Sequence, residues 1–264
     1  MIRNIPILLY HSVNEQSSEK FLRWTIHPRM FDAHLAYLCS QGYYLVTVSE
    51  LVRMLGNSSN PLPERLGVIS FDDGFEDFYT HAMPLLQGHH VPATLYVTTD
   101  YIGQTSRWLA AEGESHKPMM TWSQIREVAG QSVEIGAHSL SHPALDILDR
   151  NSAWREIDGS KRVLESGLHR NISSFAYPHG YHTQETRALV EKAGFTSACA
   201  VKNSISDPED DPFALARIII SHDVDVPLLA RLLNGEGLVP KHKRERLATV
   251  GWRVARRVLS LLST

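Results

Sequence analysis

Apolar residues follow two different spacings along the chain, and the two alternate regularly. Short apolar runs that favour β-strands occur at residues 6–10, 43–46, 66–71, 93–97, 133–137, 173–177, 197–201 and 214–220. Apolar residues recur at helical spacing over residues 28–40, 49–54, 75–86, 121–128, 153–165, 183–193 and 226–233. Ser49 and Thr121 are predicted to cap the two helices that they begin.

This alternation predicts an α/β fold in which helices cover a parallel sheet. About seven strand–helix units in one domain favour a barrel over an open sheet. In such barrels the chemically active residues lie at the C-terminal ends of the strands, so polar residues that directly follow an apolar run are candidates for a site. Residues 100–121 show no period and are expected to form a long loop, a kind of segment that is often functional.

Composition is that of a globular protein and excludes several classes. The 264 residues suffice for one large domain, with 43% hydrophobic and 21% charged residues. A net charge of −3 gives no reason to expect nucleic acid as a partner. The sequence has no apolar run of the roughly 18 residues that a membrane span requires.

The cysteines and the N-terminus indicate a reducing compartment. Cys39 and Cys199 both lie in apolar surroundings, so buried free thiols are expected rather than a disulfide. The first residues contain no signal-peptide hydrophobic region and no small-residue cleavage site. A cytoplasmic enzyme, possibly associated with a membrane, is the expectation.

Two adjacent carboxylates, Asp72 and Asp73, end the apolar run 66–71 and are followed by Gly74. Side chains alternate in direction along a strand, so the pair can diverge and take two roles. One carboxylate can bind a metal while the other acts as a base. The competing interpretation is an ordinary helix cap or turn, where aspartate is common.

Two histidines, His138 and His142, follow the apolar run 133–137. Imidazole is the commonest ligand for zinc-like metals, although two surface histidines would not be unusual in a chain with 14 of them. Gly136 and Pro143 bracket the pair, so a loop at a strand end is favoured over a helix face. Two histidines and one carboxylate would leave open positions for water, as catalytic metal sites do.

These segments resemble the motifs of the polysaccharide deacetylases, also called the NodB-homology or fourth carbohydrate esterase family. Residues 70–74 (SFDDG) resemble the first motif, 138–143 (HSLSHP) the second and 175–180 (FAYPHG) the third. Residues 6–13 (PILLYHSV) are similar to the start of many bacterial members. The resemblance covers residues 5–235 and implies a distorted (β/α)7-type barrel, the NodB homology domain.

The resemblance also implies the roles of individual residues. It assigns a divalent metal, zinc or another transition metal, to Asp73, His138 and His142, and the general base to Asp72. The third motif implies that the backbone N–H of His179 stabilises the oxyanion. It also places Tyr177 and Pro178 beside the substrate.

The chain departs from the family pattern in three places. The third motif lacks its usual arginine, and Arg217 is the nearest substitute. The fifth motif is represented by Ile220-Ser221-His222, so His222 is the first candidate for the acid and His11 the second. No fourth motif is evident; Trp122 is a candidate for the aromatic wall, and a core position is the competing interpretation.

Residues 241–264 differ from the rest, so we divide the chain into a barrel over 1–240 and a basic amphipathic C-terminal helix over 241–264. Seven basic residues against one acid, Glu245, give this segment a net charge of +6 and leave −9 elsewhere: Lys241, Lys243, Arg244, Arg246, Arg253, Arg256 and Arg257. Apolar residues recur there at helical spacing. We favour a helix packed on the barrel with a solvated basic face over one lying on a membrane surface.

Together these features predict a metal-dependent hydrolase that removes N-acetyl, or O-acetyl, groups from a carbohydrate. The absence of an export signal favours a substrate in bacterial polysaccharide or envelope biosynthesis. Two alternatives stay open. One is an amidohydrolase of the same fold that acts on a non-sugar C–N bond, and the other is an inactive barrel that binds glycan.

Overall fold

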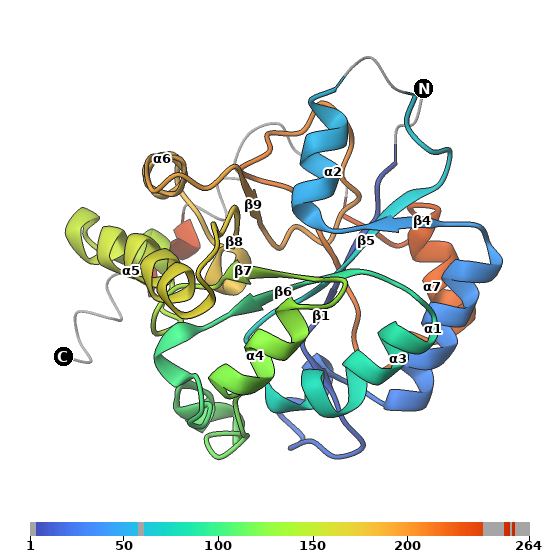
Figure 1. The fold of residues 1–264 in the computed structure, drawn as a ribbon, viewed down its shortest axis with the longest axis horizontal. Helices are drawn as coiled ribbons and strands as arrows, with labels where there is room; N and C mark the ends of the chain where they lie inside the picture. The colour runs from blue at the N-terminus through green and yellow to red at the C-terminus, as the bar shows by residue number, and fades with distance from the viewer. Residues whose placement is uncertain (1–3, 58–60, 240–250, 254, 257–264) are drawn as a thin grey trace.

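The computed structural model describes residues 4–57, 61–239, 251–253 and 255–256. A curled sheet of parallel strands forms its centre, and helices surround the sheet (Figure 1). The strands are β1 (Ile7–Tyr10), β4 (Tyr44–Val46), β5 (Leu66–Phe71), β6 (Ala93–Val97), β7 (Val133–Ala137), β8 (Ser174–Ala176), β9 (Ser197–Cys199) and β10 (Ile218–Ile219). This half-barrel confirms the predicted α/β class and the barrel-like architecture.

Strand order in the sheet is β10-β1-β5-β6-β7-β8-β9, with β4 pairing the first half of β5. Between β9 and the segment before β10, the described residues form a single bridge, from Cys199 to Leu215. The predicted strand 214–220 is therefore wrong in its extent, because only Ile218 and Ile219 pair with β1. Residues 214–217 thus link the bridge to β9 with the pairing of β10 on β1.

The main helices are α1 (Pro28–Ser40), α2 (Val48–Leu55), α3 (Met83–Gly88), α4 (Trp122–Ala129), α5 (Arg150–Leu168), α6 (Gln184–Lys192) and α7 (Val226–Leu233). Thr121 caps α4 through a capping box, as predicted. The cap predicted for α2 is wrong, because the side chain of Thr47, not that of Ser49, accepts the backbone N–H of Glu50 in the first turn. A π-helical turn (Phe78–Ala82) precedes α3 within the helix predicted over 75–86.

The strands at the centre of the sheet are completely buried. Every residue of β1, β5 and β6 is buried, as expected for strands with helices on one side and a filled interior on the other. Cys199 is buried in this interior, but Cys39 is exposed near the end of α1. The prediction that both thiols are buried is therefore wrong for Cys39, which lies on the outward face of an amphipathic helix.

The long segment expected over residues 100–121 is present as a series of short 3₁₀ turns, η3 (Thr99–Tyr101) and η4 (Arg107–Glu112). Antiparallel bridges join it to the chain after β5 and close it on itself: Phe75 to Met119 and Thr105 to Pro118. A small apolar cluster fastens it to the loop after β2 (Ser12–Val13), through Phe21, Phe75, Leu109 and Met119. The segment therefore forms one wall above the C-terminal ends of the strands.

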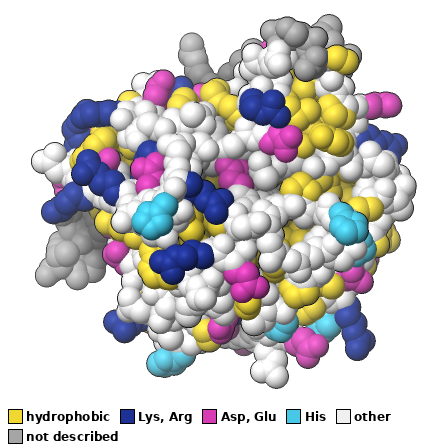
Figure 2. Space-filling view, in the orientation of Figure 1, with side chains coloured by type: hydrophobic (Ala, Val, Ile, Leu, Met, Phe, Trp, Pro, Cys, Tyr) yellow, Lys and Arg dark blue, Asp and Glu magenta, His cyan; other side chains and the backbone are white. Residues whose placement is uncertain are grey.

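The division into a barrel and a C-terminal helix stays a prediction, since residues 240–250, 254 and 257–264 lie outside the described part of the chain. Gly251–Arg253 and Ala255–Arg256 are helical. None of the helices in the described ranges is long and apolar enough to cross a membrane. Acidic and basic side chains are interspersed over the face seen in Figure 2, with no broad field of one sign.

Candidate metal centre and active site

The chain brings Asp73, His138 and His142 together in a buried cluster at the C-terminal edge of the sheet. Their candidate ligand atoms all lie within 4.8 Å of one another. Asp73 Oδ1 is 3.6 Å from His138 Nε2 and 3.3 Å from His142 Nε2. β5 ends one residue before the aspartate pair and β7 ends at Ala137, so the strand ends carry these side chains to one place.

The hydrogen bonding of this cluster fits a cation. The Nδ1–H of His138 donates to the carbonyl of Ala176 at 2.8 Å, which leaves the Nε2 lone pair directed at Asp73. Asp73 Oδ1 is buried and has no hydrogen-bond partner. A lone pair facing an unpartnered carboxylate oxygen is unfavourable unless a cation or proton lies between them. Two imidazoles and one carboxylate are the donor set of a catalytic zinc-like site.

The electrostatics of the two aspartates differ. Burial, and the neighbouring negative charge of Asp72, raise the pKa of Asp73 well above its usual value. Burial would also raise the pKa of Asp72, but Arg217 and His138 lower it below the usual value. Asp72 is therefore stable as an anion within the protein, whereas Asp73 needs a cation to be stable as one.

Several residues of the cluster have strained backbone. Asp73 has φ 77° and His142 has φ 64°, both in the left-handed region that non-glycine residues avoid. His179, at the third motif, has φ 57°. Such conformations cost of order 1–3 kcal/mol each and are concentrated at functional sites. Gly74, with φ 87°, completes the turn without that cost and lets the chain leave β5 sharply.

Arg217 contacts the aspartate that is not in the metal-ligand set. Its Nη1 and Nη2 donate to the two oxygens of Asp72 at 2.6 and 2.7 Å, and its Nε donates to the carbonyl of Ala200. The guanidinium is fully buried and comes from residues just before β10. Arg217, the predicted substitute for the missing third-motif arginine, thus forms a bidentate pair with Asp72.

His11 lies beside the same carboxylate. The backbone N–H of Asp72 donates to the carbonyl of Tyr10, because β1 and β5 end level with each other. The ring of His11 packs on that of Trp24 in a tilted arrangement with centroids 4.7 Å apart, and its Nδ1 is buried without a partner. Burial lowers the pKa of His11 to about 4.

His222, the first candidate for the acid, is exposed two residues beyond the end of the buried strand segment. The pKa of the neighbouring Asp223 is lowered most by the hydrogen bond from Ser221, and His222 makes a smaller contribution in the same direction. Among the described residues, His222 makes no contact with the Asp/His cluster. Of the two candidates, the structure therefore brings only His11 next to Asp72.

The third motif contains two buried residues, Tyr177 and Pro178, and one residue, His179, whose ring lies near the cluster. Tyr177 is buried, and its hydroxyl donates to the carbonyl of Phe213 at 3.0 Å. Pro178 is buried next to it, so neither side chain is free at the rim. The His179 ring lies edge-on to His142 with centroids 4.7 Å apart. Of this motif, the carbonyl of Ala176 and the ring of His179 contact the metal-ligand cluster.

An aromatic ring that the sequence analysis did not single out lies against the Asp/His cluster. Trp122 packs on Gly167 of α5 and under the guanidinium of Arg126, which places it among the helices rather than at the cluster. Trp108 in η4 lies against His142 instead, with ring centroids 5.4 Å apart. The lack of a period over residues 100–121 was the one sequence feature that pointed to this part of the chain. It predicted a functional loop but did not indicate which of its residues faces the site.

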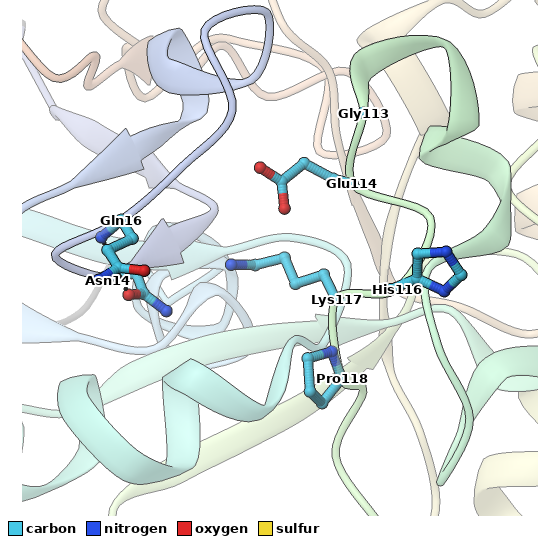
Figure 3. A pocket seen from close by; sticks show the side chains of 7 residues that line it. All are labelled: Asn14, Gln16, Gly113, Glu114, His116, Lys117 and Pro118. Carbon is cyan, nitrogen blue, oxygen red and sulfur yellow. Dashed lines mark hydrogen bonds between the residues drawn. The ribbon is translucent and has the colours of Figure 1, made fainter.

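A separate hollow of about 320 Å³ lies between the 14–16 loop and residues 113–118 (Figure 3). Lys117, one of its lining residues, pairs with Asp77 at 2.8 Å, and both side chains are almost fully buried. Asp77 also accepts the hydroxyl of Ser12. This ion pair ties the wall segment to the chain that follows the aspartate motif.

Residues 59–198 match the family model for polysaccharide deacetylase. The chain belongs to the polysaccharide deacetylase family. It is thus a carbohydrate deacetylase, a hydrolase that removes acetyl groups. It is 28% identical over 217 residues to YxkH of Bacillus subtilis, which is named for the same family, covering 82% of this chain and 71% of that protein. A poly-β-1,6-N-acetyl-D-glucosamine N-deacetylase of Staphylococcus aureus is 21% identical, covering 81% of this chain and 74% of its own length.

Two solved structures share this fold. The deacetylase PplD of Streptococcus pyogenes, in complex with acetate, superposes with a TM-score of 0.76 at 25% identity, over 88% of this chain and 99% of that one. IcaB from Ammonifex degensii gives a TM-score of 0.75 at 25% identity, over 88% and 98% of the two chains. The half-barrel is therefore the deacetylase fold.

Arg217→Met should destabilise the protein strongly, because it leaves the buried carboxylate of Asp72 without its partner. Removing one partner of a buried pair costs about 3–5 kcal/mol. Arg150 forms an ion pair with Glu185 in which both side chains are more than half exposed, so Arg150→Met is the control and should cost about 1 kcal/mol or less. Denaturant unfolding measures the free energy of unfolding of each variant. Equal losses in the two variants would contradict the importance of the buried pair.

Proposed function

We propose that the enzyme uses a divalent metal held by Asp73, His138 and His142 to hydrolyse N-acetyl groups of a saccharide. The observation that carries this proposal is the unpartnered, buried Oδ1 of Asp73 between two imidazole nitrogens. When bound, such a cation lowers the pKa of a coordinated water toward about 7 and polarises the acetyl carbonyl. Zinc fits the donor set, and other transition metals can use it as well.

Asp72 is the proposed general base. Its carboxylate lies 3.7 Å from His138 Nε2, so it borders the metal-ligand cluster without belonging to it. Arg217 holds the carboxylate in one orientation and keeps its pKa low, so that Asp72 is ionised and ready to accept a proton from water. The backbone N–H of His179 is the proposed donor to the oxyanion, as its place beside His142 allows.

His11 is the proposed proton donor to the leaving amine. It lies next to Asp72, whereas His222 is exposed at the surface. Because burial lowers the pKa of His11 to about 4, an imidazolium formed there during turnover would be a strong acid and would release its proton readily. In the proposed cycle the proton that Asp72 accepts from water is relayed to the neighbouring His11, which passes it to the nitrogen, so both groups end the turnover in their starting protonation states.

N-Acetylglucosamine oligosaccharides are the first substrates to test, since the Staphylococcus aureus relative is named for a polymer of that sugar. Membrane contact through residues 241–264 stays a proposal of its own. Acetate release from a panel of N-acetylated saccharides, with metal added and with metal chelated, tests the function. Metal-dependent release supports it. A protein that hydrolyses only non-sugar amides would support the alternative amidohydrolase.

Replacing any one of the metal ligands should remove metal and activity together. We expect Asp73→Ala, His138→Ala and His142→Ala each to purify with little bound metal, because a three-ligand site needs every member. His89, which pairs with Asp32 at the surface, provides the control: His89→Ala should keep the metal. Elemental analysis of the purified proteins measures this, and full occupancy in His138→Ala would refute the ligand assignment.

The proton donor can be identified with two substrates. His11→Ala should slow an N-acetyl sugar by about 10²-fold or more, since an amine needs a proton to leave. It should slow 4-nitrophenyl acetate much less, because that leaving group departs as an anion. His222→Ala should leave the ratio of the two rates unchanged. The opposite pattern would assign the acid to His222.

A further inference from the structure

Two of the proposed metal ligands lie on one short loop, residues 138–142, which follows β7. His138 comes directly after the strand, and its Nδ1–H donates to the carbonyl of Ala176. His142 lies four residues further on, and in the described part of the chain its buried Nδ1 has no hydrogen-bond partner. The loop backbone, together with ring packing on Trp108 and His179, therefore sets where His142 lies.

The backbone of this loop is strained at two positions. Ser139 has φ 63° and His142 has φ 64°, and both values lie in the left-handed region that residues with a Cβ avoid. One hydrogen bond lies within the loop, from the backbone N–H of His142 to Ser139 Oγ at 3.0 Å. Strained conformations persist only where the surrounding structure enforces them. The loop therefore needs partners outside itself.

Glu156, on α5, is such a partner. The backbone N–H groups of Leu140 and Ser141 both donate to its Oε2 at 2.9 Å. The hydroxyl of Ser141 donates to its Oε1 at 2.7 Å. Hydrogen bonds to a carboxylate are about twice as strong as those between neutral groups. A single side chain thus accepts three hydrogen bonds from the two residues that directly precede His142.

The surroundings of Leu140 complete the attachment of the loop. Gly159 lies one turn after Glu156 on α5, and a Cβ there would come within 2.8 Å of Leu140 Cδ1. The helix is therefore shaped to let this side chain pack closely. The carbonyl of Leu140 accepts the backbone N–H of Asp100, which belongs to η3 after β6. The loop is held between α5 and η3, and Glu156 contributes the charged contact.

We propose that Glu156 is a positioning residue for the metal centre, which holds the 138–142 loop in its strained conformation so that His142 reaches Asp73. It acts through the loop backbone, since its contacts are with Leu140 and Ser141. The inference rests on the proposed function and adds a residue that sets the affinity for the metal. Replacing a group that orients metal ligands typically weakens metal binding by about 10- to 100-fold.

Zinc affinity of the full chain tests this role, measured after chelation by competition with a zinc-binding dye. Glu156→Leu leaves two backbone N–H groups without their acceptor and should raise the Kd for zinc by about 10- to 100-fold. Glu156→Gln keeps an oxygen that accepts both N–H groups and gains an amide that donates to the Ser141 hydroxyl. Its Kd should therefore stay within about 3-fold of the wild-type value, because only the charge of the acceptor is lost.

Glu165 provides a matched control on the same helix. It accepts the backbone N–H of Ile172 at 3.1 Å, in the chain that leads to β8 and not to a metal ligand. Glu165→Leu should lower Tm and leave the Kd for zinc unchanged. A wild-type Kd in Glu156→Leu would overturn the positioning role. Equal weakening in Glu156→Leu and Glu156→Gln would overturn it as well, since charge and not hydrogen bonding would then be responsible.

Should Glu156→Leu fail to fold, Glu156→Asp decides. It keeps the charge but withdraws the carboxylate by one methylene group, so the Kd should rise by about 3- to 10-fold, the usual effect of losing one net hydrogen bond. An unchanged Kd in Glu156→Asp would refute the inference. A failure of the proposed metal site gives a different result, in which the wild-type protein binds zinc no more tightly than His138→Ala does.

Discussion

The site depends on keeping two adjacent buried carboxylates chemically different. Like charges in one buried place cannot both be ionised without compensation, and Asp72 and Asp73 follow each other directly. The structure solves this with one bidentate contact from Arg217, which makes Asp72 the stable anion. Asp73 is left with an unpartnered oxygen and two facing imidazoles, so its charge is compensated only when a cation binds. This difference separates the proposed base, Asp72, from the proposed metal ligand, Asp73.

The parallel sheet makes that separation possible. Because β1 and β5 end level with each other, His11 and Asp72 become neighbours although 60 residues lie between them. Leu215 bridges to Cys199 of β9 and β10 pairs with β1, and the chain between these two pairings places Arg217 in the interior. Arg217 thus reaches Asp72 from the segment between the two pairings and lowers the pKa of the proposed base. Strained backbone at Asp73 and His142 then aims the ligands inward.

Sequence reasoning could predict the features that depend on local pattern. The strands 66–71, 93–97 and 133–137 and the helix 28–40 agree with the structure to the residue, since each has a clear period and clear ends. The motifs of the Asp/His cluster could be identified as well, because each directly follows one of these clearly bounded strands. What could not be predicted depends on tertiary contact. Trp108 was missed because its segment has no period, and Trp122 was suggested because nothing in the sequence shows that it packs on α5.

The central claim is that Asp72 is a base held beside a metal site and not a ligand of it. Asp72→Asn keeps the shape of the side chain and removes the proton acceptor. Bound metal and acetate release from an N-acetylglucosamine oligosaccharide should be measured on the same preparation. The account predicts unchanged metal content with a kcat lower by about 10²-fold or more. Loss of the metal, with activity restored when metal is added back, would contradict it and make Asp72 a ligand.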